Sequence, residues 1–170
     1  MNTANVSTTT VDSFQIRRAE REDSPRILQL IQELASYEKL SHEVVTTVED
    51  LERDLFGERP CAEVLLVCLG QEVVGYALFF HNYSTFAGRP GIYLEDLFVK
   101  PSFRGRGYGK ALMVALAKLA VERGCARFEW TVLDWNQPAI DFYRSLGAVI
   151  KQEWRIVRVD GEGLEKLAKA

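Results

Sequence analysis

Residues 92–110 read IYLEDLFVKPSFRGRGYGK, and this stretch decides the fold class. Its first part, 92–99, is the apolar and aromatic run of a β-strand. A short spacer then leads into a loop with alternating glycines, 104–109, and apolar residues at helical spacing follow at once. This order predicts a strand, a glycine-rich loop and a helix from about residue 107 to about residue 123.

Two helices are expected in the chain before this stretch. A Ser-Pro pair at 24–25 suits the start of the first, and its apolar residues through residue 35 recur at i, i+3, i+4, i+7 and i+8. The second helix, 47–56, has the pattern of a capping box between its first residue and Asp50, and a glycine follows its end. Both helices should bury one apolar face.

The expected strands make a mixed sheet. Residues 63–69 and 72–83 are rich in Val, Leu, Phe and Tyr around a Gly70-Gln71 turn, which predicts a hairpin. An antiparallel half joined to βαβ crossovers predicts an α/β fold, a mixed sheet with helices on both faces. The remaining expected elements are strands at 14–18, 127–133 and 154–159 and a helix at 138–146.

Composition predicts one cytoplasmic domain. A chain of 170 residues with 47% hydrophobic content can build one sizeable core, so we expect a flexible tail at 1–12 and a single domain over 13–170. No apolar run approaches the roughly 20 residues of a membrane span, and the first residues do not resemble a signal peptide. The net charge of -3 argues against a nucleic-acid partner.

Cysteine and histidine do not predict a metal site. Cys61, Cys68 and Cys125 lack CxxC spacing and suit structural thiols rather than a disulfide framework. His42 and His81 stand alone in the sequence. We therefore predict no metal.

Acidic residues are concentrated between residues 33 and 58, where eight acids accompany two bases. Such a cluster is either the solvated face of a helix or an electrostatic funnel for a cation. The sequence leaves both interpretations open.

The glycine loop suits a phosphate group. Its backbone can approach a ligand closely, and the first N–H groups of the following helix lack carbonyl partners of their own. Arg104, Arg106 and Lys110 add positive charge. A Walker A loop would need glycine at Arg104 and a hydroxyl residue at Ala111. A dinucleotide loop would need glycine at Lys110, although Glu129 lies at a suitable spacing; this interpretation and a purely structural turn remain open.

The loop and three further stretches resemble one family. Arg104-Gly-x-Gly-x-Gly109 resembles the acetyl-CoA pyrophosphate loop of the GNAT acetyltransferases, which have the acyl-CoA N-acyltransferase fold. Residues 30–38, 93–99 and 135–143, together with Trp154-Arg155, resemble the spermidine/spermine (diamine) N-acetyltransferase subfamily. The resemblance covers residues 14–167. It implies an acetyl-CoA-dependent N-acetyltransferase of small cationic amines, and a homodimer.

The same resemblance assigns residues to the cosubstrate acetyl-CoA. Backbone groups of Leu97, Phe98 and Val99 would pair with the pantetheine arm. Asn136, which by its place before Pro138 also suits an N-cap, would contact the cofactor as well. The pyrophosphate would lie on Arg104, Gly105, Arg106, Gly107, Tyr108, Gly109 and Lys110.

Tyr143 is the candidate acid. The resemblance implies that it protonates the departing thiolate, and a phenol of pKa ~10 can donate to a thiolate whose conjugate acid is near ~8.5. From the sequence pattern alone, Tyr143 is interpreted first as a core aromatic residue beside Phe142, and it is the resemblance that favours the catalytic role.

Glu95 and Asp96 are the candidate acid–base partners for the amine. Adjacent strand residues point to opposite faces, so one of them shares the site unless a bulge intervenes. The resemblance favours Glu95, acting through water. Tyr37, Glu38, Glu95 and Asp96 would bind the substrate.

The substrate stays open at this point. Phe86 stands where the family has tryptophan, and the turn at Gly70-Gln71 is short. A polyamine, a short diamine and a lysine-like amino acid such as thialysine all fit. A protein or peptide N-acetyltransferase and a non-catalytic acyl-CoA-binding module are the alternatives.

Overall fold

A computed structural model describes residues 14–170, which form two compact units. The first ends at Thr131 and the second runs over Val132–Ala170. The expected tail at 1–12 lies outside the described residues, and the single domain over 13–170 remains a prediction. Among residues 14–170, no helix combines the length and the apolar character that crossing a bilayer requires.

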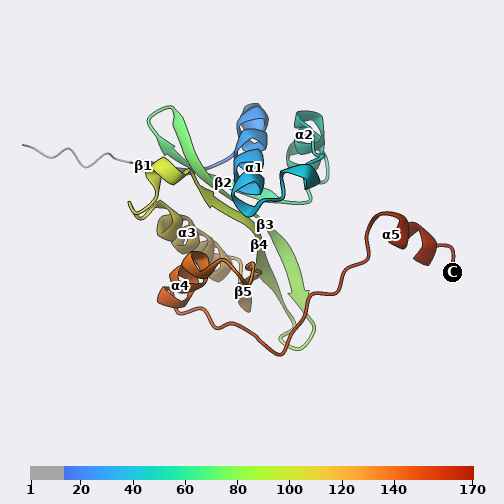
Figure 1. Ribbon diagram of the computed structural model, residues 1–170. Helices are drawn as coiled ribbons and strands as arrows, with labels where there is room; N and C mark the ends of the chain where they lie inside the picture. Colours follow the sequence, from blue (N-terminus) through green and yellow to red (C-terminus); the bar gives the residue numbers. More distant parts are fainter. Residues whose placement is uncertain (1–13) are drawn as a thin grey trace, which may run out of the picture. The chain divides into compact units, whose positions relative to one another are not determined.

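The first unit contains a five-stranded sheet in the order β1-β2-β3-β4-β5 (Figure 1). The first four strands pair antiparallel with their neighbours, and β4 pairs parallel with β5. The predicted mixed sheet is therefore confirmed. The strands are β1 (Phe14–Arg18), β2 (Glu63–Leu69), β3 (Glu72–Ser84), β4 (Arg89–Val99) and β5 (Arg127–Trp130).

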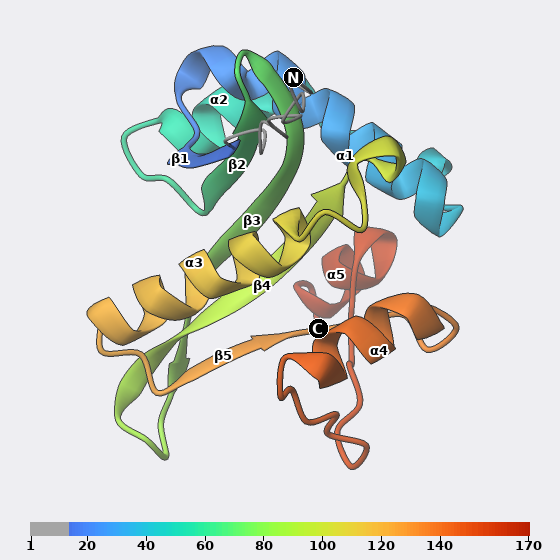
Figure 2. The same cartoon turned by 90° about the vertical axis from the view of Figure 1, so that its left-hand side faces the viewer.

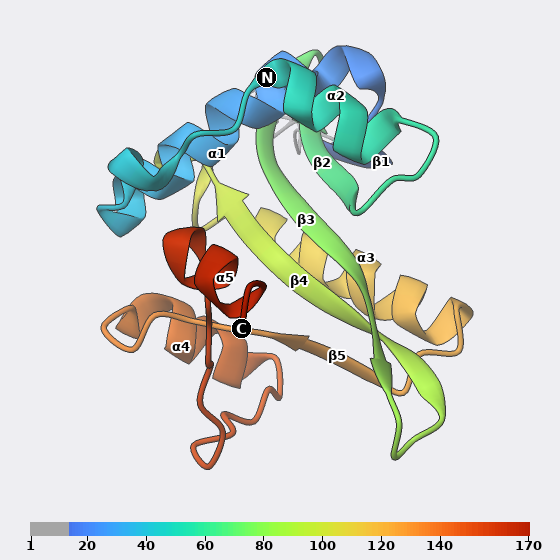
Figure 3. The ribbon, with the colours of Figure 1, turned by 90° about the vertical axis from the view of Figure 1, so that its right-hand side faces the viewer.

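Helices cover both faces of this sheet. The helices α1 (Ser24–Glu38) and α2 (Val48–Phe56) lie on one face, and α3 (Tyr108–Glu122) lies on the other, as the two side views show (Figure 2, Figure 3). A buried apolar cluster fills the space between α1, α2 and the sheet. Its members are Ile27, Leu30, Leu34, Leu51, Val64, Leu66, Cys68, Val73, Tyr76 and Phe98.

The helix starts follow local capping. Thr47 is the N-cap of α2. Its hydroxyl oxygen accepts a hydrogen bond from the Asp50 amide, and the Asp50 carboxylate accepts one from the Thr47 amide. Ser24 is the first residue of α1, and Asp23 is the N-cap, one residue earlier than predicted. The reason is a 3₁₀ turn at Arg21–Asp23, whose carbonyl at Arg21 accepts a bond from Ser24 Oγ.

The second unit contains α4 (Gln137–Ser145) and α5 (Gly161–Leu167). The predicted strand at 127–133 ends at Trp130, and the predicted strand at 154–159 is wrong, because that segment has no regular structure. A strand needs a partner for its backbone groups, and within residues 14–170 this exposed segment pairs with none. The pattern of apolar residues carries no information about that partner.

Candidate functional site

An acidic pocket of about 380 Å³ opens between α1, the segment that follows it and β4. Its acidic lining residues are Glu38, Glu43, Glu95 and Asp96, and apolar side chains such as Leu34 complete the wall. Among the residues that the structure describes, no Lys or Arg side chain lines it. The structure therefore brings three of the predicted substrate residues, Glu38, Glu95 and Asp96, into one cavity.

A β-bulge explains how neighbouring residues reach the same pocket. Leu78 pairs with Asp96, but the next residue, Phe79, pairs with Leu94, so Glu95 is an extra residue in β4. Regular alternation would place Glu95 and Asp96 on opposite faces. The bulge interrupts the alternation, and both carboxylates line the pocket. Glu95 is exposed, whereas Asp96 is half-buried.

Tyr76 is a site residue that the sequence analysis missed. It lies in β3 and is fully buried, and its hydroxyl donates a 2.9 Å hydrogen bond to Asp96 Oδ2. Burial raises the pKa of Tyr76 well above its ordinary value, with further contributions from Asp96 and Glu38, so the phenol stays protonated. The available signal was a hydroxyl-bearing aromatic residue within the otherwise apolar run 73–80, because a buried tyrosine needs a polar partner.

Two of the pocket carboxylates, Glu38 and Asp96, have a raised pKa and so hold their protons more tightly than usual. Burial raises the pKa of Asp96, the bond from Tyr76 lowers it, and the charge of Glu95 raises it. Burial likewise raises the pKa of Glu38, and the nearby charge of Asp96 adds to this. A cation in the pocket would favour the ionised form of both carboxylates.

The glycine loop leaves backbone amides at the start of α3. Gly107 is the N-cap, with φ +86, and the Ala111 amide makes the first bond of the helix, to the Gly107 carbonyl. The amides of Tyr108, Gly109 and Lys110 therefore have no carbonyl partner in the helix. A side chain added at Gly107 would meet no atom within 4 Å, so the loop has open space beside it. These features suit an anion.

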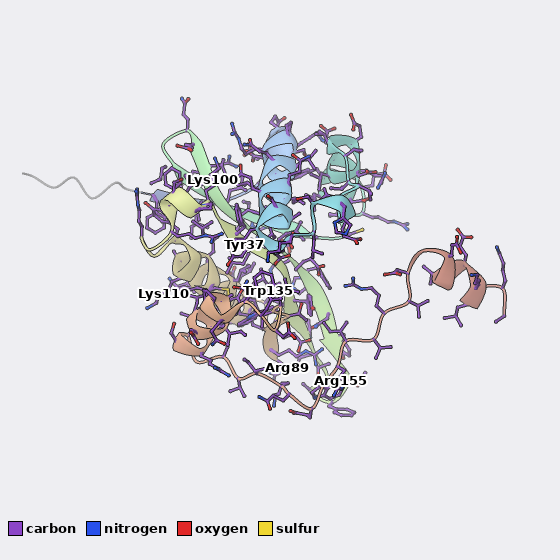
Figure 4. The ribbon with its side chains drawn as sticks, in the orientation of Figure 1. Tyr37, Arg89, Lys100, Lys110, Trp135 and Arg155 are labelled. Carbon is purple, nitrogen blue, oxygen red and sulfur yellow. The ribbon has the colours of Figure 1, made fainter. Side chains whose placement is uncertain are left out.

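Arg104 links the loop to the pocket side of the molecule. Its Nε donates to the Val99 carbonyl at 2.9 Å, and its guanidinium lies over the rings of Tyr37 and Phe98. Tyr37 lies at the end of α1 and Lys110 lies on α3 (Figure 4). The side chain of Arg104 thus contacts a predicted substrate residue, a role that the sequence did not suggest.

The strands β4 and β5 pair over a short distance. Pairing runs from Gly91 to Leu94 on β4, whereas β4 continues to Val99. Beyond Leu94, β4 has β3 on one side, and no other strand within residues 14–170 pairs with its second edge. An extended ligand could therefore bind along the backbone of residues 97–99, as a strand would.

The second unit carries Asn136 and Tyr143. Asn136 is buried and caps α4, because its Oδ1 accepts from the Ala139 amide at 3.4 Å, which confirms the predicted N-cap. Tyr143 is half-buried on the same helix, with its ring centroid 5.3 Å from that of Phe142.

Metal ligands do not gather in the described part of the chain. Residues 14–170 contain no group of three or more His, Cys, Asp or Glu side chains placed to hold a metal ion.

Comparison with known proteins gives consistent matches. The pattern of the "Acetyltransferase (GNAT) family" matches residues 25–148. A thialysine N-epsilon-acetyltransferase from Sus scrofa is 42% identical over 167 residues, which cover 92% of this chain and 98% of the relative. A spermidine/spermine N(1)-acetyltransferase-like protein 1 from Homo sapiens is 35% identical over 94% of this chain and 24% of its own length. A solved integron cassette protein from the mobile metagenome of V. cholerae superposes with a TM-score of 0.79 at 30% identity, covering 93% of this chain and 99% of that one.

Proposed function

Since the chain belongs to the GNAT acetyltransferase family, we propose that it transfers the acetyl group of acetyl-CoA to the amino group of a small cationic amine. The family resemblance read from the sequence, the fold class and the assignment as an acetyltransferase are confirmed by the family match and by the relatives. The observation that carries the proposal is the pocket lined by Glu38, Glu95 and Asp96 without a basic side chain.

The pocket favours an amine because its charge is matched. An alkyl amine of pKa ~10 arrives protonated at neutral pH, and carboxylates in a partly buried pocket attract it more strongly than carboxylates in water would. A thialysine-like amino acid is the first candidate, since the Sus scrofa relative carries that name. Its terminal ammonium group would enter the pocket, while its own carboxylate would stay outside, away from the acidic lining. Polyamines and short diamines belong in the same test.

The residues of the first unit fit acetyl-CoA as cosubstrate. The open space beside Gly107, the unpaired amides at the start of α3 and the cation Lys110 suit a pyrophosphate. Backbone groups of Leu97, Phe98 and Val99 suit the pantetheine arm. Asn136 is the proposed contact from the second unit. Acetyl-CoA supplies an acetyl thioester, whose C–S bond breaks as the C–N bond of the product forms.

Two side chains would handle the protons. The ammonium group must lose a proton before it attacks, and Glu95, exposed at the pocket wall, would accept it through water. The leaving thiolate must gain a proton, and Tyr143 Oη would donate it. On going from ammonium to amide the nitrogen loses two protons: one leaves through Glu95, and the other offsets the proton that Tyr143 gives to the thiolate, so each turnover releases one proton. Tyr37 would contribute to the substrate site beside Glu38.

A panel of amines tests the proposal. Purified protein is incubated with acetyl-CoA and with thialysine, lysine, putrescine, spermidine, spermine or a basic peptide, and release of free thiol is followed. We expect release with one or more small amines, and its loss in Tyr143→Phe. Release with the peptide alone would assign a peptide N-acetyltransferase. If no amine of the panel causes thiol release while acetyl-CoA still binds, the protein is a binding module and the proposal is overturned.

A homodimer belongs to the proposal as well, because the family resemblance implies it. Light scattering coupled to gel filtration measures the mass directly. A mass of two chains at micromolar concentration is expected, and a single 19.3 kDa species would contradict it.

A further inference from the structure

We propose that Tyr76 is a positioning residue that holds Asp96 as a fixed anion in the pocket, where Asp96 binds a second cationic group of the amine. This inference rests on the proposed acetylation of a cationic amine. It assigns different tasks to the two adjacent carboxylates: Asp96 binds charge, and Glu95 accepts the proton.

The geometry places the phenol beside Asp96. Tyr76 and Leu78 point to the same face of β3, and Leu78 pairs directly with Asp96. The Tyr76 hydroxyl reaches diagonally across the pair and donates to Asp96 Oδ2 at 2.9 Å. Because Tyr76 is fully buried, water cannot replace this bond. The second oxygen, Oδ1, is then the atom available to a substrate ammonium group.

The surroundings of Asp96 would otherwise favour its protonated form. The titratable groups that face it are Glu38 from α1, Glu95 from β4, Glu43 from the segment after α1 and Tyr76 from β3. Three of these four are acids. Among the described residues, the Tyr76 bond is the interaction that lowers the pKa of Asp96 against burial and the charge of Glu95. The phenol itself remains protonated, so it acts as a permanent donor.

The consequence is a division of labour. An anion that already accepts a bond from a fixed donor is more stable as an anion than the same carboxylate without that donor, which suits it to bind a cation and makes it a poorer proton acceptor than it would be without the bond. Glu95, in the bulge and exposed, has no such donor among its described contacts. A proton leaving the amine would therefore pass to Glu95 through water, while Asp96 keeps the substrate in place.

Tyr76→Phe tests this inference, because it removes the hydroxyl and keeps the ring. We compare 1,5-diaminopentane with 1-aminopentane, which has the same length and lacks the second cation. A hydrogen bond to a charged group is worth about a tenfold change in binding or more. The KM for the diamine should rise about tenfold, that for the monoamine should change little, and the acidic limb of kcat/KM should move to higher pH. Tyr83 is an exposed tyrosine in the same strand, so Tyr83→Phe is the matched control. It should change neither KM value and should leave the pH profile where it is.

Asp96→Asn completes a double-mutant cycle. If Tyr76 acts through Asp96, adding Tyr76→Phe to Asp96→Asn should change the KM for the diamine no further. Equal loss of activity toward both amines, or additive effects in the cycle, would show a role in stability alone and overturn the inference. Should Tyr76→Phe fail to fold, Asp96→Asn alone decides: unchanged preference for the diamine would refute the role of Asp96.

A second readout needs no catalysis. The pKa of Asp96 is measured by ¹³C NMR of the labelled carboxyl group in the wild type, in Tyr76→Phe and in Tyr83→Phe. We expect it to rise in Tyr76→Phe alone, and an unchanged pKa would overturn the inference. If the wild type acetylates no amine, the proposed function fails, and this titration still decides whether Tyr76 holds Asp96 as an anion.

Discussion

The guanidinium of Arg104 lies over the ring of Tyr37, 4.5 Å from its centroid, and so joins the loop before α3 to the last turn of α1. The same side chain fixes its Nε on the carbonyl of Val99, at the end of β4. One residue thus contacts both the proposed cofactor strand and a proposed substrate residue. A change at Arg104 should be felt at both sites.

Arg104→Lys tests this coupling. Lysine keeps the charge but loses the flat guanidinium that stacks on Tyr37 and the Nε donor. We expect the KM for the amine and the Kd for CoA to rise together, each by about three- to tenfold. Arg106→Lys is the matched control, because Arg106 packs on Phe103 and should affect CoA alone. Calorimetry with CoA and initial rates with the amine measure the two effects, and a change in one of them alone would refute the coupling.

Gly107→Ala should weaken the binding of CoA. The residue has φ +86, which costs an L-residue about 1–2 kcal/mol, so the loop would shift to relieve the strain although the new methyl group has open space. We expect the Kd for CoA to rise about tenfold. Gly124→Ala, with φ +67 and open space after the other end of α3, should lower the thermal stability similarly and leave the Kd unchanged. If both variants weaken CoA binding equally, the loop has no special role.

Tyr143→Phe should slow the chemical step. Removing a general acid typically costs a factor of about 10² or more in kcat, whereas the affinity for acetyl-CoA should stay similar. Steady-state kinetics with the best amine of the panel, together with CoA binding by calorimetry, separate the two quantities. A raised Kd at unchanged kcat would make Tyr143 a packing residue beside Phe142.

Local patterns predicted the elements well. The strands β1 and β2 have the expected bounds, β3 extends one residue further than expected, and the Thr47–Asp50 box fixed the start of α2 within one residue. These elements depend on neighbours in the sequence, which is the information that a single sequence holds. The start of β4 at Arg89 was missed because Pro90 and Gly91 resemble a loop, although proline is tolerated at the start of a strand, before pairing with β5 begins at Gly91.

The site was predicted less completely, because it depends on long-range register. The Tyr76–Asp96 bond joins residues on different strands, and the bulge at Glu95 is visible only in the pairing of β3 with β4. No local pattern specifies that one-residue shift. The prediction of a strand at 154–159 failed for the same reason, since the apolar residues of this segment suggest a strand but do not specify a pairing partner. The sequence thus identified Glu95 and Asp96, and the structure placed both in one pocket.

Arg123 and Glu63 should make the stability of the protein dependent on pH. Both terminal nitrogens of Arg123 donate to the Glu63 carboxylate, one of them at 2.8 Å to Oε2, and Arg18 lies nearby as a further cation. The bond to Arg123 lowers the pKa of Glu63 below its ordinary value, and the pKa of Arg123 is raised in turn. A carboxyl group with a lowered pKa in the folded state stabilises the protein above its unfolded pKa, near ~4.3, and loses this contribution as the pH falls through the folded value.

Arg123→Met should therefore destabilise the protein at neutral pH by about 1–2 kcal/mol, since the pair is bidentate and partly buried. The difference from the wild type should shrink as the pH falls below about 4. Arg53→Met is the control, because Arg53 pairs with Asp54 and Asp50 at an exposed site where such pairs contribute little. Urea unfolding from pH 3 to pH 7 measures all three proteins. A constant difference across this range would mean that Arg123 stabilises through its packing on Phe79 rather than through its charge.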